Sequence, residues 1–327
     1  MNQCSVSFIL SYYQVEGLLL KQCLESLFAL SAQIDAEVIL IDDGTPDSPV
    51  PTWLAEWDMA TRIRYHYQEN KGLGGARNTG MQMATKEYIQ FVDPDDYLIA
   101  EAYGRVLTLL QEKQPDLLAF YFYKVYDRTV AATPEIRASI LYEGSGTDFL
   151  LRNNLHAGAC SYLFRRALAE GLSFPEHTYH EDEAFTPLLY LRVGRLIVTD
   201  IPAYAYFQRK ESIMNSGSRD KLHKRFSDLL KIQLGLEQQS VLMEAEARTA
   251  MRRRIDQNYM AMLFKLMTDS PNGAFLSLYL KRMKKQKGYP LPVHAYTRKY
   301  FLFSLFTALP FVPALFRRLF VALYKKI

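Results

Sequence analysis

Three carboxylates interrupted by a proline, Asp93-Pro94-Asp95-Asp96, follow directly after the apolar run Tyr88–Val92. The run predicts a buried strand, and Pro94 ends it because proline fixes its own φ. In open α/β sheets, ligands bind at the carboxyl ends of the strands. Carboxylates this close together repel one another, so they need a partner cation or raised pKa values. We therefore expect Asp93 and Asp95 to hold a divalent metal whose remaining positions are taken by substrate phosphates.

The same stretch also has a plainer interpretation, in which the acids form a turn and the N-cap of a following helix. We expect Asp96 to take that part and to cap a helix over Leu98–Glu112. For Asp93 and Asp95 the metal interpretation is preferred, because two segments upstream have related chemistry.

The two upstream segments have the residue types of a nucleotide or phosphate site. Asp42-Asp43-Gly44-Thr45 follows the apolar run Val38–Ile41, so acids again stand at the carboxyl end of a predicted strand. The segment Asn70–Gly80 is rich in glycine and contains Arg77, whose planar guanidinium suits phosphate or carboxylate. It matches neither the P-loop spacing nor the dinucleotide fingerprint, and a flexible loop that leads into a helix explains it equally well.

The elements that must position these residues alternate between strands and helices. Three apolar runs predict buried strands at residues 6–10, 38–41 and 88–92, and the alternating segment 63–67 predicts a further strand. Helical spacing predicts the first helix over Gly17–Leu30. Later strands are predicted at Leu117–Phe122, at Ala159–Phe164 and, as an edge strand, at Ala203–Lys210. This order predicts an α/β fold with a doubly wound, largely parallel sheet.

The composition suits a globular protein with an uneven charge. The chain has 327 residues and 49% hydrophobic content, enough for a sizeable core. From Met251 onward it has 15 Lys and Arg against 2 Asp and Glu, a net of +13, so the first 250 residues carry −9. An acidic part joined to a basic tail suggests contact with a polyanion, either nucleic acid or an anionic membrane. Three scattered cysteines, Cys4, Cys23 and Cys160, indicate reduced thiols in a cytosolic setting, and the amino terminus lacks a signal-peptide pattern.

Four blocks, in order, resemble the inverting glycosyltransferases of family 2, which have the GT-A fold. Val6–Gln14 is similar to the opening strand and Pro-x-Tyr-Asn loop of that family, and Ile41–Thr45 to Val-Asp-Asp-Gly-Ser. Gly74–Gly80 is similar to Ala-Arg-Asn-x-Gly, and Asp93–Asp96 to the DxD motif. The similarity implies a GT-A, Rossmann-like sheet. The chain departs from the family pattern within the first block, where Ser11 replaces the usual Pro and Gln14 the usual Asn.

The resemblance implies that Ser11, Tyr13 and Asp43 bind the nucleotide of a sugar donor. Tyr13 would lie against the base, and Asp43 would hydrogen-bond it, the base being uracil in the commonest case.

The resemblance also implies roles at the diphosphate. Asp93 would contact the ribose or donor sugar, and Asp95, with Asp93, would hold Mg²⁺ or Mn²⁺ on the diphosphate. Gly74 and Arg77 would lie near the donor. The metal would stabilise the charge that the departing nucleoside diphosphate takes up.

A block of acids at Glu181-Asp182-Glu183 resembles the Glu-Asp pair that supplies the catalytic base in the family. Asp182 is the expected base, because an acceptor hydroxyl needs a positioned acceptor for its proton, and Glu181 is the nearest rival. His180 would orient the acid or bind phosphate. The alternative is structural, because acids at the start of a helix suit its positive end.

The composition changes after residue 215, which divides the expected catalytic domain (1–215) from a helical, basic C-terminal region (216–327). Helical spacing covers Leu222–Met243, Arg252–Met267 and Phe275–Met283. The uncharged stretch Tyr300–Phe316 is shorter than the ~20 residues of a membrane-spanning helix. Aromatic residues beside Lys and Arg fit an interfacial tail on an anionic membrane, and the alternative is packing on the protein or a second subunit. Glu211–Ser218 is a candidate lid or a surface loop.

These features predict a metal-dependent inverting glycosyltransferase that uses a nucleotide sugar, with a UDP-sugar favoured. The acceptor would be a saccharide, lipid-linked, at the cytosolic face of the cell membrane during surface polysaccharide synthesis. Two alternatives stay open: a non-catalytic nucleotide-sugar-binding or scaffold subunit, and a sugar nucleotidyltransferase, which would need a glycine-rich loop after the first strand. No nucleic-acid-binding module is legible, and homo-oligomer formation is left open.

Overall fold

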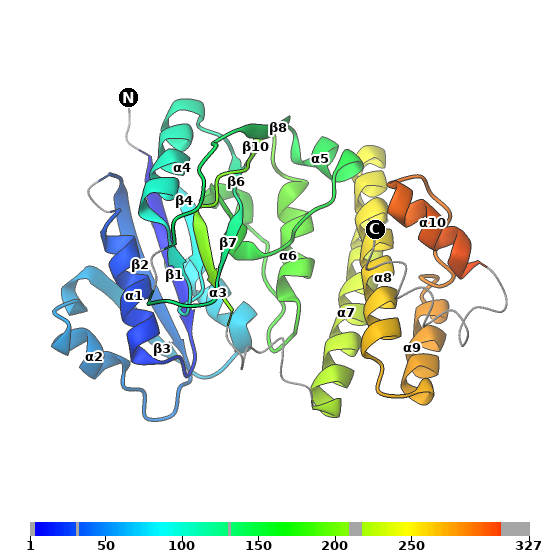
Figure 1. Cartoon of the computed structure of the whole chain (residues 1–327), viewed down its shortest axis with the longest axis horizontal. Helices are drawn as coiled ribbons and strands as arrows, with labels where there is room; N and C mark the ends of the chain where they lie inside the picture. Colours follow the sequence, from blue (N-terminus) through cyan, green and yellow to red (C-terminus); the bar gives the residue numbers. More distant parts are fainter. Residues whose placement is uncertain (1–3, 31–32, 130–131, 209–217, 309–327) are drawn as a thin grey trace. The chain divides into compact units, whose positions relative to one another are not determined.

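The structure is a computed structural model of the chain, and it describes residues 4–30, 33–129, 132–208 and 218–308. The chain forms two compact units (Figure 1). Unit 1 comprises Met1–Phe149 and His156–Ser216, and unit 2 comprises Leu150–Leu155 and Gly217–Ile327. Each unit has its own core of buried apolar side chains.

Unit 1 is built on an eight-stranded sheet with the strand order β3-β2-β1-β4-β9-β6-β10-β8. The first four strands are parallel and follow the predicted apolar runs: β1 (Ser5–Tyr12), β2 (Asp35–Asp43), β3 (Ile63–Gln68) and β4 (Tyr88–Val92). All five residues of β4 are buried, as expected for a parallel strand covered on both faces. The expected α/β fold with a largely parallel central sheet is confirmed.

The second half of the sheet is mixed. It contains β6 (Leu117–Ala119), β8 (Ile140–Gly144), β9 (Tyr162–Arg165) and β10 (Leu196–Thr199). Strand β9 runs antiparallel between β4 and β6, whereas β10 runs parallel to β6. A separate three-stranded sheet has the order β5-β11-β7, with β5 (Tyr97–Leu98), β7 (Phe122–Val125) and β11 (Tyr204–Phe207).

Three strand predictions need correction. The run Ala159–Phe164 is a strand only from Tyr162, where β9 begins, because Ala159–Ser161 forms a turn of 3-10 helix. The run Leu117–Phe122 is not one strand, because the backbone at Phe120 and Tyr121 pairs with Ser161 and Ile201 while the chain passes from one sheet to the other. The predicted edge strand at Ala203–Lys210 is β11, and β11 is the middle strand of the small sheet. Strand β11 pairs with β5 on one side and with β7 on the other, and two of its four residues are buried.

Helices cover both faces of the large sheet. The helices of unit 1 are α1 (Gly17–Phe28), α2 (Val50–Glu56), α3 (Gly72–Met83), α4 (Ala100–Lys113) and α6 (Glu181–Tyr190). The short helix α5 (Gly146–Arg152) begins in unit 1, and its residues from Leu150 onward belong to unit 2. One core joins α1 and α4 to strand residues such as Phe8. On the other face Phe91 meets the stacked rings of Phe174 and Phe185, whose centroids lie 3.9 Å apart. Helix α3 comes so close to β1 that a Cβ on Gly80 would lie 2.2 Å from Ile9.

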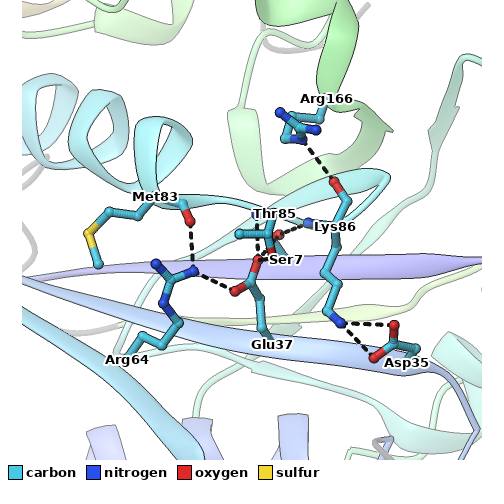
Figure 2. A network of polar contacts seen from close by, with 8 residues as sticks. All are labelled: Ser7, Asp35, Glu37, Arg64, Met83, Thr85, Lys86 and Arg166. Carbon is cyan, nitrogen blue, oxygen red and sulfur yellow. Dashed lines mark hydrogen bonds and ion pairs between the residues drawn. The ribbon is translucent and has the colours of Figure 1, made fainter.

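A polar network ties the amino ends of the parallel strands together (Figure 2). The Glu37 carboxylate of β2 accepts hydrogen bonds from Ser7 of β1 at 2.7 Å and Arg64 of β3 at 2.7 Å. Both the N–H and the hydroxyl of Thr85, just before β4, donate to it at 2.6 and 2.8 Å. Burial alone would raise the pKa of Glu37, but these donors lower it to about 2. One carboxylate thus fixes the register of four strands.

Unit 2 is helical, as its sequence pattern predicts. Its helices are α7 (Arg219–Ser240), α8 (Ala245–Asp269), α9 (Gly273–Lys285) and α10 (Arg298–Thr307) (Figure 1). Two buried arginines of α8, Arg253 and Arg254, donate to the carbonyls of Leu150 and Leu155, each at 2.8 Å. These bonds explain why residues 150–155 belong to this unit. Within the part of the chain that the structure describes, no helix has the length and apolar content needed to cross a membrane.

The Glu37 network predicts a pH-dependent contribution to stability. Because its pKa is lowered from 4.5 to about 2, this contribution is present above pH 4.5 and is lost as the pH falls from 4.5 toward 2. We expect Glu37→Gln to lower the free energy of unfolding by about 2 kcal/mol at pH 7 and by less near pH 2.5. Urea unfolding at both pH values measures this. The exposed Glu112→Gln on α4 is the control, and equal stabilities of the two variants at pH 7 would contradict the assignment.

Candidate active site

A cleft of about 370 Å³ opens at the carboxyl ends of β1, β2 and β4. Five of the predicted site residues line it: Ser11, Tyr13, Asp43, Asp93 and Asp95. They are brought together because parallel neighbouring strands end at the same edge of the sheet. The ring of Tyr13 is 47% exposed, which leaves a face for a planar ligand.

The two acids that end β2 have different surroundings. Asp42 is fully buried and accepts hydrogen bonds from Thr45, Ser48 and Tyr65, so it closes the turn after the strand. Asp43 lines the cleft, and its Oδ1 accepts from the Gln68 amide at 2.6 Å and from a backbone N–H at 2.9 Å. The carboxylate of Asp43 is therefore held in one orientation at the cleft wall.

Arg77 joins two segments that are distant in sequence. Its side chain is 4% exposed, and it forms ion pairs with Glu181 at 2.7 Å and with Asp93 at 3.3 Å. Its guanidinium also lies 5.6 Å from the ring of Phe91 and 5.4 Å from that of Phe174. Burial alone would lower the pKa of Arg77, but the two carboxylates outweigh burial and raise it. Arg77 is therefore a permanent buried cation between the end of β4 and the start of α6.

Asp93 is held through both carboxylate oxygens. Arg77 contacts Oδ1, and the Cys160 thiol donates to Oδ2 at 3.2 Å. Burial, and then the charge of Asp93, raise the pKa of Cys160, so the thiol keeps its proton and stays a donor. The backbone N–H of Asp93 donates to the Tyr204 hydroxyl at 3.0 Å. These contacts leave Asp93 little freedom to reorient.

The prediction that Asp96 caps the next helix is wrong. Helix α4 begins at Ala100 after Ile99, without a side-chain cap, and the short strand β5 lies between Asp96 and the helix. Asp96 is buried instead, and its Oδ1 accepts from the backbone N–H of Phe207 at 2.7 Å. Burial, and then the charges of Asp93 and Asp95, raise its pKa. The residue links the DxD-like turn to β11.

Asp95 lines the cleft beside Tyr206 and Phe207, and its carbonyl accepts from Arg128 at 2.7 Å. The Arg128 guanidinium lies 4.9 Å from the ring of Tyr97 and 5.6 Å from that of Phe207. Arg128 could not be predicted from the sequence, because it lies in a turn after β7 and no motif surrounds it. The strand β11 was predicted, but its position beside the cleft was not.

The acids at positions 181–183 do begin a helix, α6, after His180 in the left-handed conformation with φ 62°. Glu181 is buried in its pair with Arg77. Burial, followed by repulsion from Glu181 and Glu183, raises the pKa of Asp182 to about 7. Neither Glu181 nor Asp182 is among the described residues that line the cleft. Glu181 instead pairs with Arg77, which also contacts Asp93, and Asp182 is the next residue of α6.

The glycine-rich segment is helical, not a flexible loop, because α3 already begins at Gly72. A Cβ on Gly74 would lie 2.5 Å from the carbonyl oxygen of Pro175, so this glycine lets two backbones pack closely. The Asn78 amide reinforces that contact by donating to the Phe174 carbonyl at 2.9 Å and accepting from its N–H at 2.8 Å. The segment before α6 is thereby fixed to α3. Contact of Gly74 or His180 with a donor stays a prediction.

The carboxylates of the cleft fit a metal ion only if substrate phosphates supply further ligands. Within the described ranges, no three His, Cys, Asp or Glu residues are grouped so that they could hold a metal ion. Asp93 and Asp95 line the same cleft, and one or two carboxylates completed by phosphate oxygens is a common Mg²⁺ arrangement. The candidate lid lies outside the described residues, apart from Ser218 at the start of α7.

Comparisons with known proteins agree on one family. Residues 7–172 match the model of glycosyl transferase family 2. The chain is 33% identical over 220 residues to the uncharacterized glycosyltransferase EpsJ of Bacillus subtilis (64% of this chain, 62% of EpsJ). It is 26% identical over 228 residues to the glycosyltransferase GlyA of Streptococcus pneumoniae (67% of this chain, 32% of GlyA). The matched regions thus leave more than a third of each relative uncovered.

A third relative, the poly(ribitol-phosphate) beta-N-acetylglucosaminyltransferase TarS of Staphylococcus aureus, is 25% identical over 182 residues (54% of this chain, 30% of TarS). The solved structure of TarS 1-349 with UDP superimposes with a TM-score of 0.61 at 18% identity, covering 99% of this chain and 92% of that one. The complex with UDP-GlcNAc gives a TM-score of 0.58 at 19% identity, covering 92% and 79%. At this identity the structural likeness establishes the fold.

The buried pairs of Arg77 predict a large cost for removing the cation. Arg77→Gln leaves Glu181 and Asp93 without their partner, and we expect the free energy of unfolding to fall by about 3 kcal/mol. Arg105→Gln, on the exposed side of α4, is the matched control and is expected to change it by less than about 0.5 kcal/mol. Chemical unfolding of both variants at pH 7 measures the difference. Similar losses in the two would show that the Arg77 pairs contribute little.

Proposed function

Because the chain belongs to glycosyl transferase family 2, we propose that it transfers a sugar from a nucleotide-diphosphate donor, a UDP-sugar, to a saccharide acceptor with inversion at the anomeric carbon. The observation that carries this proposal is the cleft at the strand ends, with Arg77 linking its Asp93 to Glu181 of α6. The family and its curated relatives support polysaccharide or teichoic-acid-type synthesis as the setting.

The nucleotide would bind at the Tyr13 and Asp43 end of the cleft, beside Ser11. Tyr13 offers a half-exposed ring for stacking on a base. Asp43 offers a carboxylate that Gln68 and a backbone N–H already orient, so it can accept a hydrogen bond from uracil without rearrangement. TarS structures obtained with UDP and with UDP-GlcNAc support a uridine donor for this chain.

The diphosphate would bind at the other end, at Asp93 and Asp95. These two carboxylates would hold Mg²⁺ or Mn²⁺, which when bound neutralises charge on the leaving nucleoside diphosphate. Arg77 and Cys160 keep the Asp93 carboxylate in place, and Arg128 holds the backbone of Asp95. Gly74 would act through the packing of α3, and His180 would stand at the start of α6 near the transferred sugar.

Asp182 is the proposed base. A carboxyl with a pKa of about 7 is matched to proton abstraction at neutral pH, because a substantial part of it is ionised there and it is still basic enough to take a proton. Glu181, the rival, is committed to its 2.7 Å pair with Arg77, which a proton on Glu181 would weaken. Asp182 would take the acceptor proton as the acceptor oxygen displaces the nucleoside diphosphate in one step. No covalent enzyme intermediate is required.

The acceptor is proposed to be a lipid-linked saccharide, which places the enzyme at the cytosolic face of the cell membrane. The net charge of +13 from Met251 onward supports attraction to an anionic membrane. The named acceptor of TarS, poly(ribitol-phosphate), supports a cell-surface polymer as the acceptor class.

Replacing the base should abolish transfer while donor binding persists. We expect Asp182→Asn to lower kcat about 10²-fold or more, with the dissociation constant of UDP within about threefold of wild type. In the wild type, kcat/KM should fall below pH 7, because the base is protonated there. Steady-state kinetics from pH 5 to 9 and calorimetry with UDP measure both effects. If Asp182→Asn keeps its turnover, the base is another residue, with Glu181→Gln the next variant to assay.

Donor class and metal dependence are tested together. A screen of UDP-, GDP- and CMP-sugars, each with Mg²⁺, Mn²⁺ or EDTA, should give hydrolysis or transfer only with a UDP-sugar and a metal. Asp95→Asn should weaken metal-dependent donor binding about tenfold or more, because it removes a proposed ligand. Turnover that is equal with EDTA would refute the metal, and turnover with a GDP- or CMP-sugar alone would refute the uridine donor.

A further inference from the structure

Helix α10 turns its more apolar side away from the protein. The side chains that it buries are Tyr300, Phe303, Ser304 and Thr307. The outward side chains of Phe301, Leu302 and Leu305 are 39%, 62% and 42% exposed. At 3.6 residues per turn these three lie on one face of the helix, together with the exposed Arg298. A helix that packed only on its own protein would present the opposite pattern.

Hydrogen bonds fix the inward side of α10, so the helix cannot rotate to bury its outward apolar side chains. The Thr307 hydroxyl accepts from the N–H of Leu291 at 3.0 Å, and the Tyr300 hydroxyl donates to the Pro292 carbonyl at 3.1 Å. Phe303 borders a small apolar cavity of about 30 Å³ that is also lined by Leu263 of α8 and by residues of α9. The outward leucines are therefore a stable feature of unit 2.

The charged side chains of α9, α10 and the segment between them are all basic. Residues 273–308 include seven Lys and Arg and no Asp or Glu. Lys281, Lys284 and Lys285 of α9 are exposed, and within the described part of the chain none of the three forms an ion pair. Exposed leucines would not help to bind a soluble polyanion. A second copy of the chain would bring the same positive charges against this surface, which like-charge repulsion opposes.

We propose that Phe301, Leu302 and Leu305 insert into the interface of an anionic lipid bilayer, with Arg298 and the lysines of α9 among the headgroups. An amphipathic helix with apolar side chains beside Lys and Arg binds such a surface through apolar burial and through attraction to anionic headgroups. The proposal rests on the membrane placement in the proposed function, and it assigns that contact to α10 and α9. Docking there would hold the enzyme beside lipid-linked acceptors.

The test uses the full chain and sedimentation with vesicles of phosphatidylcholine alone or with 30% phosphatidylglycerol. The wild type should bind the anionic vesicles and bind the neutral ones far more weakly. Leu302→Gln/Leu305→Gln should weaken anionic binding by about tenfold or more, because it removes most of the inserted apolar area. The matched control is Val241→Gln/Leu242→Gln, at exposed apolar positions after α7, and it should bind like the wild type.

Three results would overturn the proposal. They are unchanged binding of Leu302→Gln/Leu305→Gln, equal binding of the wild type to both vesicles, and a wild-type dimer in light scattering that this variant converts to a monomer. UDP-sugar hydrolysis without vesicles separates this proposal from the proposed function. It should be equal in the wild type and the variant, and vesicle binding by a chain without any turnover would support the surface while refuting the enzyme assignment.

Discussion

A single buried guanidinium holds the candidate site together. Arg77 is almost fully buried, and the two acids that it pairs with come from 16 and 104 residues away in the sequence. Taking ions out of water costs several kcal/mol each, and the cation of Arg77 opposes the rise that burial causes in the pKa of Glu181. By satisfying Glu181 and Asp93, Arg77 leaves Asp182 as the α6 acid whose pKa burial and repulsion raise to about 7.

The rest of unit 1 brings those partners within reach. Glu37 ties the amino ends of the parallel strands together (Figure 2). The carboxyl ends of these strands, with Asp43 and Asp93, meet at the opposite edge of the sheet. Helix α3 carries Arg77 along one face of that sheet, and its Asn78 holds the Phe174 backbone ahead of α6. The cleft and the proposed base, Asp182, therefore share one scaffold, although Asp182 does not line the cleft.

The sequence was sufficient for the parts of the fold that depend on local pattern. The buried strands β1, β2 and β4, and the acids at the ends of β2 and β4, follow from apolar runs that end at polar residues, because both faces of a covered parallel strand are buried. Pairing between distant segments was not predictable. No local sequence pattern shows that Asp96 accepts a hydrogen bond from the N–H of Phe207, that Arg128 holds the Asp95 backbone, or that Gly74 of α3 packs on Pro175. Each of these contacts depends on tertiary neighbours rather than on spacing along the chain.

The most direct test of the central claim is the coupling energy between Arg77 and Glu181. Unfolding of the wild type, Arg77→Gln, Glu181→Gln and the double variant closes a cycle that isolates their interaction. A buried, hydrogen-bonded pair predicts a coupling of about 2 kcal/mol, with the double variant more stable than the sum of the single losses implies. Losses that add to within about 0.5 kcal/mol would contradict the account, because Arg77 would then not be what holds α6 to the cleft.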